Sequence, residues 1–348
     1  MAPAFDITPE KRASMLAFFQ RQLFREPPVW TRQDADLSGQ TAIVTGSNTG
    51  LGFECSAQLL DLGLSRLILA VRSESKGEEA KKLLLERQNS STPPPVIEVW
   101  KLDLSSYDSI VAFAERTKTL QRLDIAVHNA GLIKKNFEKN KFTGHEETVQ
   151  VNYLGLALFT LLLIPILEDK NTVEQPGHLV LVSSDTAAWA GFKEKNSVPL
   201  LAGFDKPESF KSQDRYATSK LLGQLFLSQL VKRVPLSSTI INAPNPGLCK
   251  SSLAREHDGL LDKLLMWAFQ SLLGRQASVG ARAFTDAAVK QGPESHGQYL
   301  EDGKVQPMAP LVYTPEGHTI AERLWRETLD ELAFAKVTDI VRSLGGQP

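Results

Sequence analysis

Six short apolar runs, separated from one another by stretches of helical pattern, constrain the fold of this chain more than any other feature. The runs are apolar throughout, as strands covered on both faces are, and do not alternate between apolar and polar residues. Such a succession of strands and helices predicts a parallel sheet with helices on both sides. We therefore expect an α/β protein with one doubly wound parallel sheet, whose strands fall at residues 41–46, 66–71, 96–102, 123–131, 178–184 and 238–247.

The composition is that of a globular protein and argues against several functions. Of the 348 residues, 42% are hydrophobic and 23% charged, which is enough to build a core without metal or disulfide support. The net charge of −1 argues against nucleic-acid binding and against electrostatic attraction to a membrane. Cys55 and Cys249 are far apart and fit no metal-ligand spacing, and the first residues lack the apolar core of a signal peptide. We expect no metal site and a reduced, cytoplasmic protein.

Residues 1–36 precede the first strand and predict a short helical extension. Thr8 can cap a helix that has Pro9 at its first position. Met15, Phe19 and Leu23 then fall on one apolar face. Packing of this face on the main domain is the simpler interpretation, and a peripheral contact with a membrane surface or a partner is the alternative.

A second apolar segment, residues 148–167, carries no charge and is about long enough to span a bilayer. It contains Gln150, Gly155 and Pro165, and it lies between two of the strand-like runs. Helices that are apolar all round also occur in protein cores, so we expect a buried or interface helix and no transmembrane span.

A glycine-rich turn, TGSNTGLG at residues 45–52, joins the first strand to the helix that follows. Such a turn lets the backbone approach a pyrophosphate closely, and the helix N-terminus supplies N–H groups and a positive dipole. The glycine spacing differs from the common G-x-G-x-x-G pattern, and tight packing alone is the alternative. At the head of a series of strands and helices, the turn predicts a nucleotide-binding Rossmann domain.

The end of the second strand predicts which nucleotide binds. NAD sites usually place an acid there for the ribose 2′-hydroxyl, whereas this chain has Arg72, followed by Lys76. The basic side chain favours the 2′-phosphate of NADP(H), with NAD(H) less favoured, although Arg72 can also be a solvated residue at a helix start. Asp103, after the third strand, can accept a hydrogen bond from an adenine amino group or cap the next helix.

Six motifs in a fixed order make the chain similar to the short-chain dehydrogenases/reductases over about residues 37–335. Further phrases (LAVR, LDLSS, GQYLEDGK and RLWRETLDEL) resemble the retinol-dehydrogenase-like and WW-domain-oxidoreductase-like branch, and many fungal biosynthetic oxidoreductases look like this too. The six motifs are TGSNTGLG, NAG at 129–131, VN at 151–152, VSS at 182–184, YATSK at 216–220 and NPG at 245–247.

The resemblance implies a catalytic set. Tyr216 would be the general acid/base, and Lys220, one helical turn later, would lower its pKa and hold the nicotinamide ribose. A phenol with a pKa of about 10 is a poor base at neutral pH, and a nearby ammonium favours the phenolate. Ser184 would bond the substrate oxygen, and Asn152 would hold a water near Lys220. A surface tyrosine beside a solvated lysine is the alternative that the other two residues argue against.

The resemblance also implies how the cofactor is held. The turn after the sixth strand would contact the nicotinamide carboxamide, and the NAG segment would line the adenine ribose, although Asn129 can be purely structural. The cofactor-binding residues implied in this way are Gly46, Ser47, Asn48, Gly50, Leu51, Gly52, Arg72, Asp103, Leu104, Asn129, Ala130, Gly131, Tyr216, Lys220, Pro246 and Gly247.

Two segments depart from the compact members of the family. Residues 185–213 lengthen the interval between Ser184 and Tyr216, and we expect them to form a substrate wall or lid, a surface loop being the alternative. Their apolar residues are Trp189, Phe192, Phe204 and Phe210. Residues 248–274 are a second expected wall, which could instead contact a membrane or a partner; its apolar residues are Leu260, Leu261, Leu264, Leu265, Trp267 and Phe269. Cys249 and His257 fit packing and surface roles better than catalysis.

The sequence thus predicts an N-terminal extension (1–36) and a Rossmann domain (37–348) that interconverts a ketone or aldehyde and an alcohol on a lipophilic small molecule with NADP(H). A non-catalytic NADP(H) sensor is one alternative, and an enzyme that catalyses dehydration, epimerisation or cyclisation is another. In many relatives the helices around 148–167 and after Tyr216 form a dimer interface. A homodimer is therefore one expectation, and a monomer is the other if the N-terminal extension covers that surface.

Overall fold

An eight-stranded sheet forms the centre of the computed structural model, which describes residues 5–88, 93–250 and 271–345. The strand order is β3-β2-β1-β4-β5-β6-β7-β8, and all neighbours are parallel except β7 and β8. The six expected strands are all present, and the closing β7–β8 hairpin was not predicted. The strands are β1 (Thr41–Thr45), β2 (Arg66–Val71), β3 (Val96–Lys101), β4 (Ile125–His128), β5 (Gly177–Leu181), β6 (Thr239–Asn245), β7 (Tyr299–Glu301) and β8 (Lys304–Gln306).

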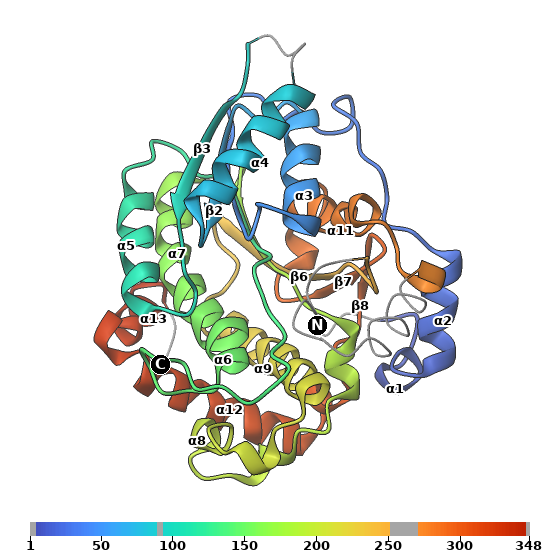
Figure 1. The fold of residues 1–348 in the computed structure, drawn as a ribbon, viewed down its shortest axis with the longest axis vertical. Coiled ribbons are helices and arrows are strands. Elements are labelled where there is room, and N and C mark those ends of the chain that lie inside the picture. Colours follow the sequence, from blue (N-terminus) through green and yellow to red (C-terminus); the bar gives the residue numbers. More distant parts are fainter. Residues whose placement is uncertain (1–4, 89–92, 251–270, 346–348) are drawn as a thin grey trace.

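Helices cover both faces of the sheet and bury a separate core on each face (Figure 1). One face carries α3 (Gly50–Asp61), α4 (Glu74–Arg87) and α11 (Ala277–Val289). The other face carries α5 (Tyr107–Lys118), α7 (Leu156–Lys170) and α9 (Ser212–Arg233), with α12 (Pro315–Glu331) and α13 (Val337–Ser343) packed outside them. Strands β1 and β4–β6 are buried almost along their whole length, which explains their continuous apolar sequence. The doubly wound Rossmann architecture is confirmed.

The apolar segment 148–167 is a core helix. It consists of α6 (Glu147–Val149), a π-helical turn (Gln150–Gly155) and α7. By length and composition alone, Glu147–Lys170 could cross a membrane, but 89% of its most apolar window is buried inside the protein. Contact with the sheet and with neighbouring helices therefore accounts for the apolar sequence.

The chain's own C-terminal helices cover the outer sides of α7 and α9. α13 packs on α7 and α12 packs on α9, where the Trp325 and Phe226 rings stack with centroids 5.5 Å apart. The Tyr153 hydroxyl lies 2.5 Å from that of Thr328. The expectation that the N-terminal extension would cover this surface is wrong, because the extension packs elsewhere.

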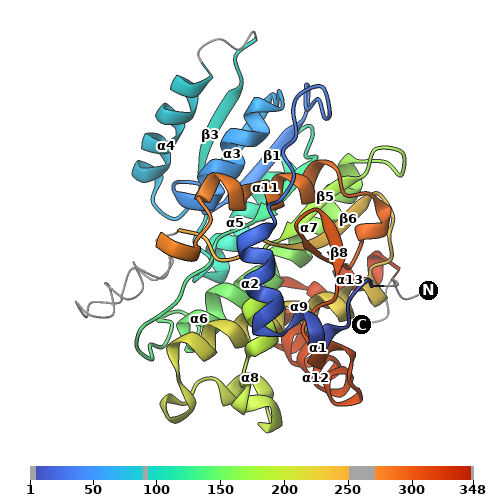
Figure 2. The same ribbon diagram turned by 90° about the vertical axis from the view of Figure 1, so that its right-hand side faces the viewer.

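The N-terminal extension forms two helices, α1 (Pro9–Arg12) and α2 (Met15–Phe24), on the side of the molecule that carries β7 and β8 (Figure 2). Thr8 caps α1 as predicted, and Ser14 begins a second helix by capping α2. The expected apolar face points the wrong way: Met15 and Leu23 are about half exposed, whereas Phe18 and Gln22 are buried. A favourable site for Phe18 against the Trp189 ring and polar partners for Gln22 set the orientation of α2.

Candidate active site

The expected cofactor and catalytic motifs all lie at the carboxyl edge of the parallel sheet. Six of them follow the end of a strand, on both sides of the point where the strand order reverses between β1 and β4, whereas Asn152 and the Tyr216–Lys220 pair lie on helices. In open α/β sheets, this edge forms the ligand crevice. In order from β1 to β6, the residues at the strand ends are Gly46, Arg72, Asp103, Asn129, Ser184 and Pro246.

The glycine turn has the geometry of a phosphate cradle. Gly46 and Gly50 have φ of +65° and +61°, which side chains rarely adopt, and a Cβ on Gly52 would lie 2.6 Å from the carbonyl oxygen of Gly46. The first turn of α3 has no side-chain cap, so its N–H groups are free to bind an anion. Among the described residues, the buried Ser47 hydroxyl has no hydrogen-bond partner. These features fit the pyrophosphate of a dinucleotide, with Asn48 and Leu51 in the same turn.

The NAG segment after β4 supports the glycine turn by hydrogen bonds to Thr45, at the end of β1. The Asn129 amide donates to the Thr45 carbonyl at 2.9 Å, and the Ala130 N–H donates to the Thr45 hydroxyl at 2.9 Å. A Cβ on Gly131 would come within 3.1 Å of the Asn152 side chain. Asn129 therefore has a structural role in this arrangement, one of the two that its sequence context allows.

The adenine end of the crevice carries the exposed side chain of Arg72. Arg72 is exposed directly after β2 and forms no ion pair with any residue that the structure describes. Asp103 binds its own chain: its Oδ1 accepts from the N–H and the hydroxyl of Ser105. The cap of α5 is Ser106, so the capping role considered for Asp103 is wrong. Leu104, the next residue, is buried.

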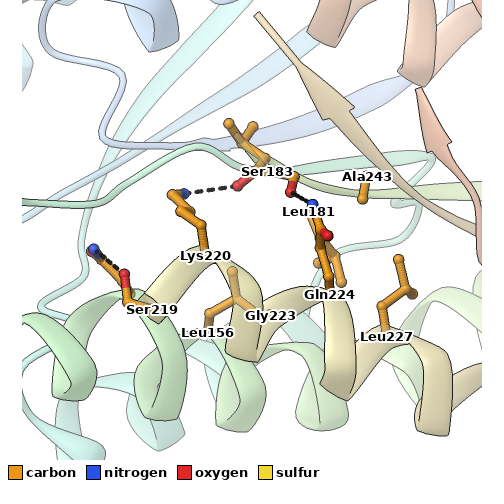
Figure 3. A pocket seen from close by; sticks show the side chains of 11 residues that line it. Leu156, Leu181, Ser183, Ser219, Lys220, Gly223, Gln224, Leu227 and Ala243 are labelled. Carbon is orange, nitrogen blue, oxygen red and sulfur yellow. Dashed lines mark hydrogen bonds between the residues drawn. The ribbon is translucent and has the colours of Figure 1, made fainter. Parts of the chain in front are cut away.

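The catalytic residues expected from the sequence come together between β5 and α9. The Tyr216 hydroxyl lies close to Ser184, whose Oγ accepts from the Thr186 hydroxyl at 2.9 Å. Lys220 Nζ lies 5.8 Å from the centre of the Tyr216 ring and donates to the Val182 carbonyl at 2.8 Å. Tyr216 and Lys220 thus share one face of α9, and Lys220 lies beside the end of β5 (Figure 3).

The electrostatics of the pair differ from the sequence expectation. Burial raises the pKa of the Tyr216 phenol, and the carboxylate of Asp185 adds to this, while the hydrogen bond with Ser184 opposes it. Burial lowers the pKa of Lys220 to about 8. The expected lowering of the Tyr216 pKa by Lys220 is not found, because the ammonium binds the Val182 carbonyl and the burial of the phenol dominates.

Asn152 lies in the π-helical turn and links two parts of the site. Its amide exchanges hydrogen bonds with both backbone groups of Leu132 at 2.8 Å and donates to the Ser219 hydroxyl at 3.0 Å. π-Helical turns often occur at functional sites, and the sequence did not predict this one. A cavity of about 20 Å³, enough for one water molecule, is lined by Asn152 and by Lys220, the latter seen in Figure 3.

The lengthened segment 185–213 folds against the body of the protein. It contains three short 3₁₀ helices and α8 (Leu200–Gly203). Phe192 and Phe204 are buried, and their stacked rings have centroids 6.1 Å apart. These two side chains fill the core and do not line a substrate wall. Trp189 and Phe210 stay partly exposed. Most of the second expected wall, including His257 and its apolar residues, lies outside the described residues.

Sequence analysis missed the buried charges that hold this segment. Arg215, directly before Tyr216, is 2% exposed and forms ion pairs with Glu194 at 2.9 Å and Glu146 at 3.6 Å. Its guanidinium also donates to the Phe204 carbonyl at 2.9 Å. The partners are distant in sequence, so no local pattern indicates these contacts.

A second cluster of buried charged residues that the sequence did not predict joins the N-terminal extension to Asp185, next to Ser184. Arg12 and Arg21 pair with the buried Glu301, which accepts a 2.7 Å hydrogen bond from Asn245. Asn245 in turn accepts from the backbone N–H of Asp185 at 3.3 Å. Burial, together with the nearby Glu301 carboxylate, raises the pKa of Asp185 to about 6.

A glycine cradle, a tyrosine close to a serine and a lysine on the next helical turn, all at the carboxyl edge of a doubly wound sheet, define a nicotinamide-dependent oxidoreductase site. The chain belongs to the short-chain dehydrogenase/reductase family. The short chain dehydrogenase family model matches residues 40–195. The chain is 51% identical to the short-chain dehydrogenase fogG of Aspergillus ruber, over 99% of both chains. It is 45% identical to the short chain dehydrogenase/reductase mfmJ of Annulohypoxylon moriforme, over 94% of both.

Solved structures show the same fold at low sequence identity. An uncharacterized protein from Mycobacterium paratuberculosis superposes with a TM-score of 0.63 at 23% identity, covering 88% of this chain and 98% of that one. The RhlG/NADP active-site complex of Pseudomonas aeruginosa gives a TM-score of 0.55 at 21% identity, covering 77% of this chain and 96% of that one. Membership in the family implies oxidoreductase activity with a nicotinamide cofactor and a small-molecule substrate.

Proposed function

We propose that this chain is an NADP(H)-dependent reductase that converts a ketone or aldehyde of a lipophilic small molecule into an alcohol, as one step of a biosynthetic pathway. The observation that carries the proposal is the placement of the Tyr216 hydroxyl close to Ser184 at the carboxyl edge of the sheet. It places a proton donor and a second hydroxyl where one carbonyl oxygen could contact both.

Each catalytic residue has a role in this proposal. The bound cofactor supplies the hydride. Ser184 orients the carbonyl oxygen, and Tyr216, whose raised pKa keeps it protonated at neutral pH, donates the proton that the new alkoxide needs. Lys220, with a pKa of about 8, is mostly protonated at neutral pH and adds positive charge beside the phenol. The cavity between Asn152 and Lys220 would hold a water that connects this lysine to the protein interior.

Family membership and the intact Tyr–Ser–Lys–Asn set support a reductase, and the two partly exposed aromatic rings of the 185–213 segment, Trp189 and Phe210, support a lipophilic substrate. The first test is NADPH consumption at 340 nm with a panel of lipophilic aldehydes and ketones, and with NADH as the control. We expect oxidation of NADPH with at least one carbonyl, at a higher kcat/KM than with NADH. Tight binding of NADPH without turnover of any carbonyl would contradict the reductase and favour a sensor.

Arg72 is expected to set the preference for NADPH. Charge-assisted hydrogen bonds contribute about 1.5–3 kcal/mol, so Arg72→Ala should raise the Kd of NADPH roughly 10- to 100-fold and leave that of NADH nearly unchanged. Lys82→Ala, which removes an exposed charge from the neighbouring α4, is the matched control and should change neither Kd. Equal losses for both cofactors, or no loss for NADPH, would show that Arg72 does not bind the 2′-phosphate.

A further inference from the structure

The turn after β6 is held in place by the N-terminal extension, which precedes the Rossmann domain that forms the turn. It begins at Pro246, and Gly247 has φ of +73°. A Cβ on Gly247 would lie 2.8 Å from Gln22 Oε1, so α2 of the N-terminal extension packs directly on the turn. Gly247 and Leu248 are only half-buried, whereas Gln22 is 7% exposed. The extension therefore supplies part of the surface on which this turn rests.

Gln22 binds both backbone groups of Leu248. Its Nε2 donates to the Leu248 carbonyl at 2.8 Å, and the Leu248 N–H donates to its Oε1 at 3.0 Å. The same Nε2 donates to the Leu273 carbonyl at 2.7 Å. One side-chain amide thus pairs with the backbone as a neighbouring strand would, and it joins the turn to the segment before α11.

Arg275, in the segment before α11, also connects α2 to the turn. This 9% exposed side chain donates to the Pro246 carbonyl at 3.2 Å and to the carbonyls of Arg21 and Arg25, at the C-terminal end of α2, at 3.1 and 2.7 Å. It also pairs with Asp302 at 2.9 Å. α2 and the turn are therefore tied to each other by two buried polar side chains, Gln22 from α2 and Arg275 from the segment before α11.

The character of α2 argues for a specific polar attachment. Of its six large apolar residues, only Phe18 is buried, against the Trp189 ring, whereas Met15, Leu16, Leu23 and Phe24 are all more than half exposed. The ion pair between Arg21 and Glu301, at 2.8 Å, connects the same end of α2 through Asn245 to the backbone of Asp185. The contacts of this helix thus converge on the backbone beside the active site.

We propose that Gln22 is a positioning residue for the cofactor, which holds the Pro246–Leu248 turn in the conformation that receives the nicotinamide end. This inference rests on the proposed function, in which that turn contacts the nicotinamide. Among the residues that the structure describes, no hydrogen bond or ion pair joins α2 to the glycine turn or to Arg72, so the adenine end should be independent of Gln22. Loss of Gln22 should therefore weaken binding of the whole cofactor and leave binding of its adenine half unchanged.

The test compares NADPH with 2′,5′-ADP, which lacks the nicotinamide, by isothermal titration calorimetry on the full chain. Gln22→Met keeps the length of the side chain and removes its hydrogen bonds. We expect the Kd of NADPH to rise about tenfold, because part of the binding free energy must then be spent on ordering the turn that the three lost hydrogen bonds held. The Kd of 2′,5′-ADP should stay within about twofold. Gln20→Ala, an exposed residue of the same helix, should change neither.

The outcomes separate the two proposals. If the wild type fails to bind NADPH, the proposed function fails, and this inference falls with it. If the wild type binds both ligands and Gln22→Met weakens both equally, or neither, the positioning role alone is wrong. If circular dichroism shows that Gln22→Met is unfolded, Gln22→Glu, which keeps the acceptor for Leu248 N–H, replaces it with the same expected selective loss.

Discussion

Tyr216→Phe is expected to lower kcat for carbonyl reduction by about 10²–10⁴-fold, the contribution typical of a general acid. The variant keeps the ring and loses only the hydroxyl that lies close to Ser184. Because Ser184 also accepts hydrogen bonds from Thr186, the serine should stay in place. The Kd of NADPH should remain within about twofold of the wild type, since a hydroxyl at the substrate side contributes little to cofactor binding. Single-turnover oxidation of NADPH and calorimetric binding measure the two quantities.

Tyr107→Phe is the matched control for this substitution. It also removes one phenol hydroxyl, which donates to Glu331 at the end of α12 at 3.1 Å. Its kcat should equal that of the wild type within about twofold. Turnover by Tyr216→Phe at a tenth of the wild-type rate or more would show that another group delivers the proton.

Most of the fold and the catalytic set could be predicted because local sequence encodes them. Continuous apolar runs identify buried parallel strands, and the glycines at 46 and 50 are required by backbone angles that other residues rarely adopt. Tyr216 and Lys220 lie one helical turn apart, so their proximity follows from the helix itself. Strands β7 and β8 escaped prediction because each has only three residues, although the Asp302–Gly303 pair between them has the two positive φ angles of a tight hairpin turn.

The rest depends on contacts between residues far apart in the chain. The orientation of α2 could not be derived from its own periodicity, because Gln22 is buried by the backbone of Leu248 and Phe18 by Trp189. Such tertiary partners outweigh the amphipathic pattern of a short helix, whose stability comes mostly from packing. The predicted lowering of the Tyr216 pKa is wrong for a similar reason. The spacing correctly placed Lys220 nearby, but burial of the phenol decides the direction in which its pKa shifts.

Arg215→Met is expected to destabilise the protein by about 3–5 kcal/mol, as removal of one partner from a buried ion pair does. Glu146 and Glu194 are 0% and 5% exposed and would lose their shared cation. The Phe204 carbonyl would also lose a hydrogen bond. Urea unfolding followed by circular dichroism measures the free energy of unfolding, and a change below about 1 kcal/mol would contradict a structural role for the pair.

Two further variants separate charge from geometry at this position. Arg215→Lys keeps the charge but cannot reach Glu194, Glu146 and the Phe204 carbonyl at once, so it should recover only part of the lost stability. Lys232→Met removes an exposed cation from the same helix and should change the free energy of unfolding by less than about 0.5 kcal/mol. Because Arg215 precedes Tyr216 on α9 and binds the 185–213 segment, a loosened segment should also raise the substrate KM of the lysine variant more than it lowers kcat. This split would show that the buried arginine orders the substrate side of the site while leaving the proton donor in place.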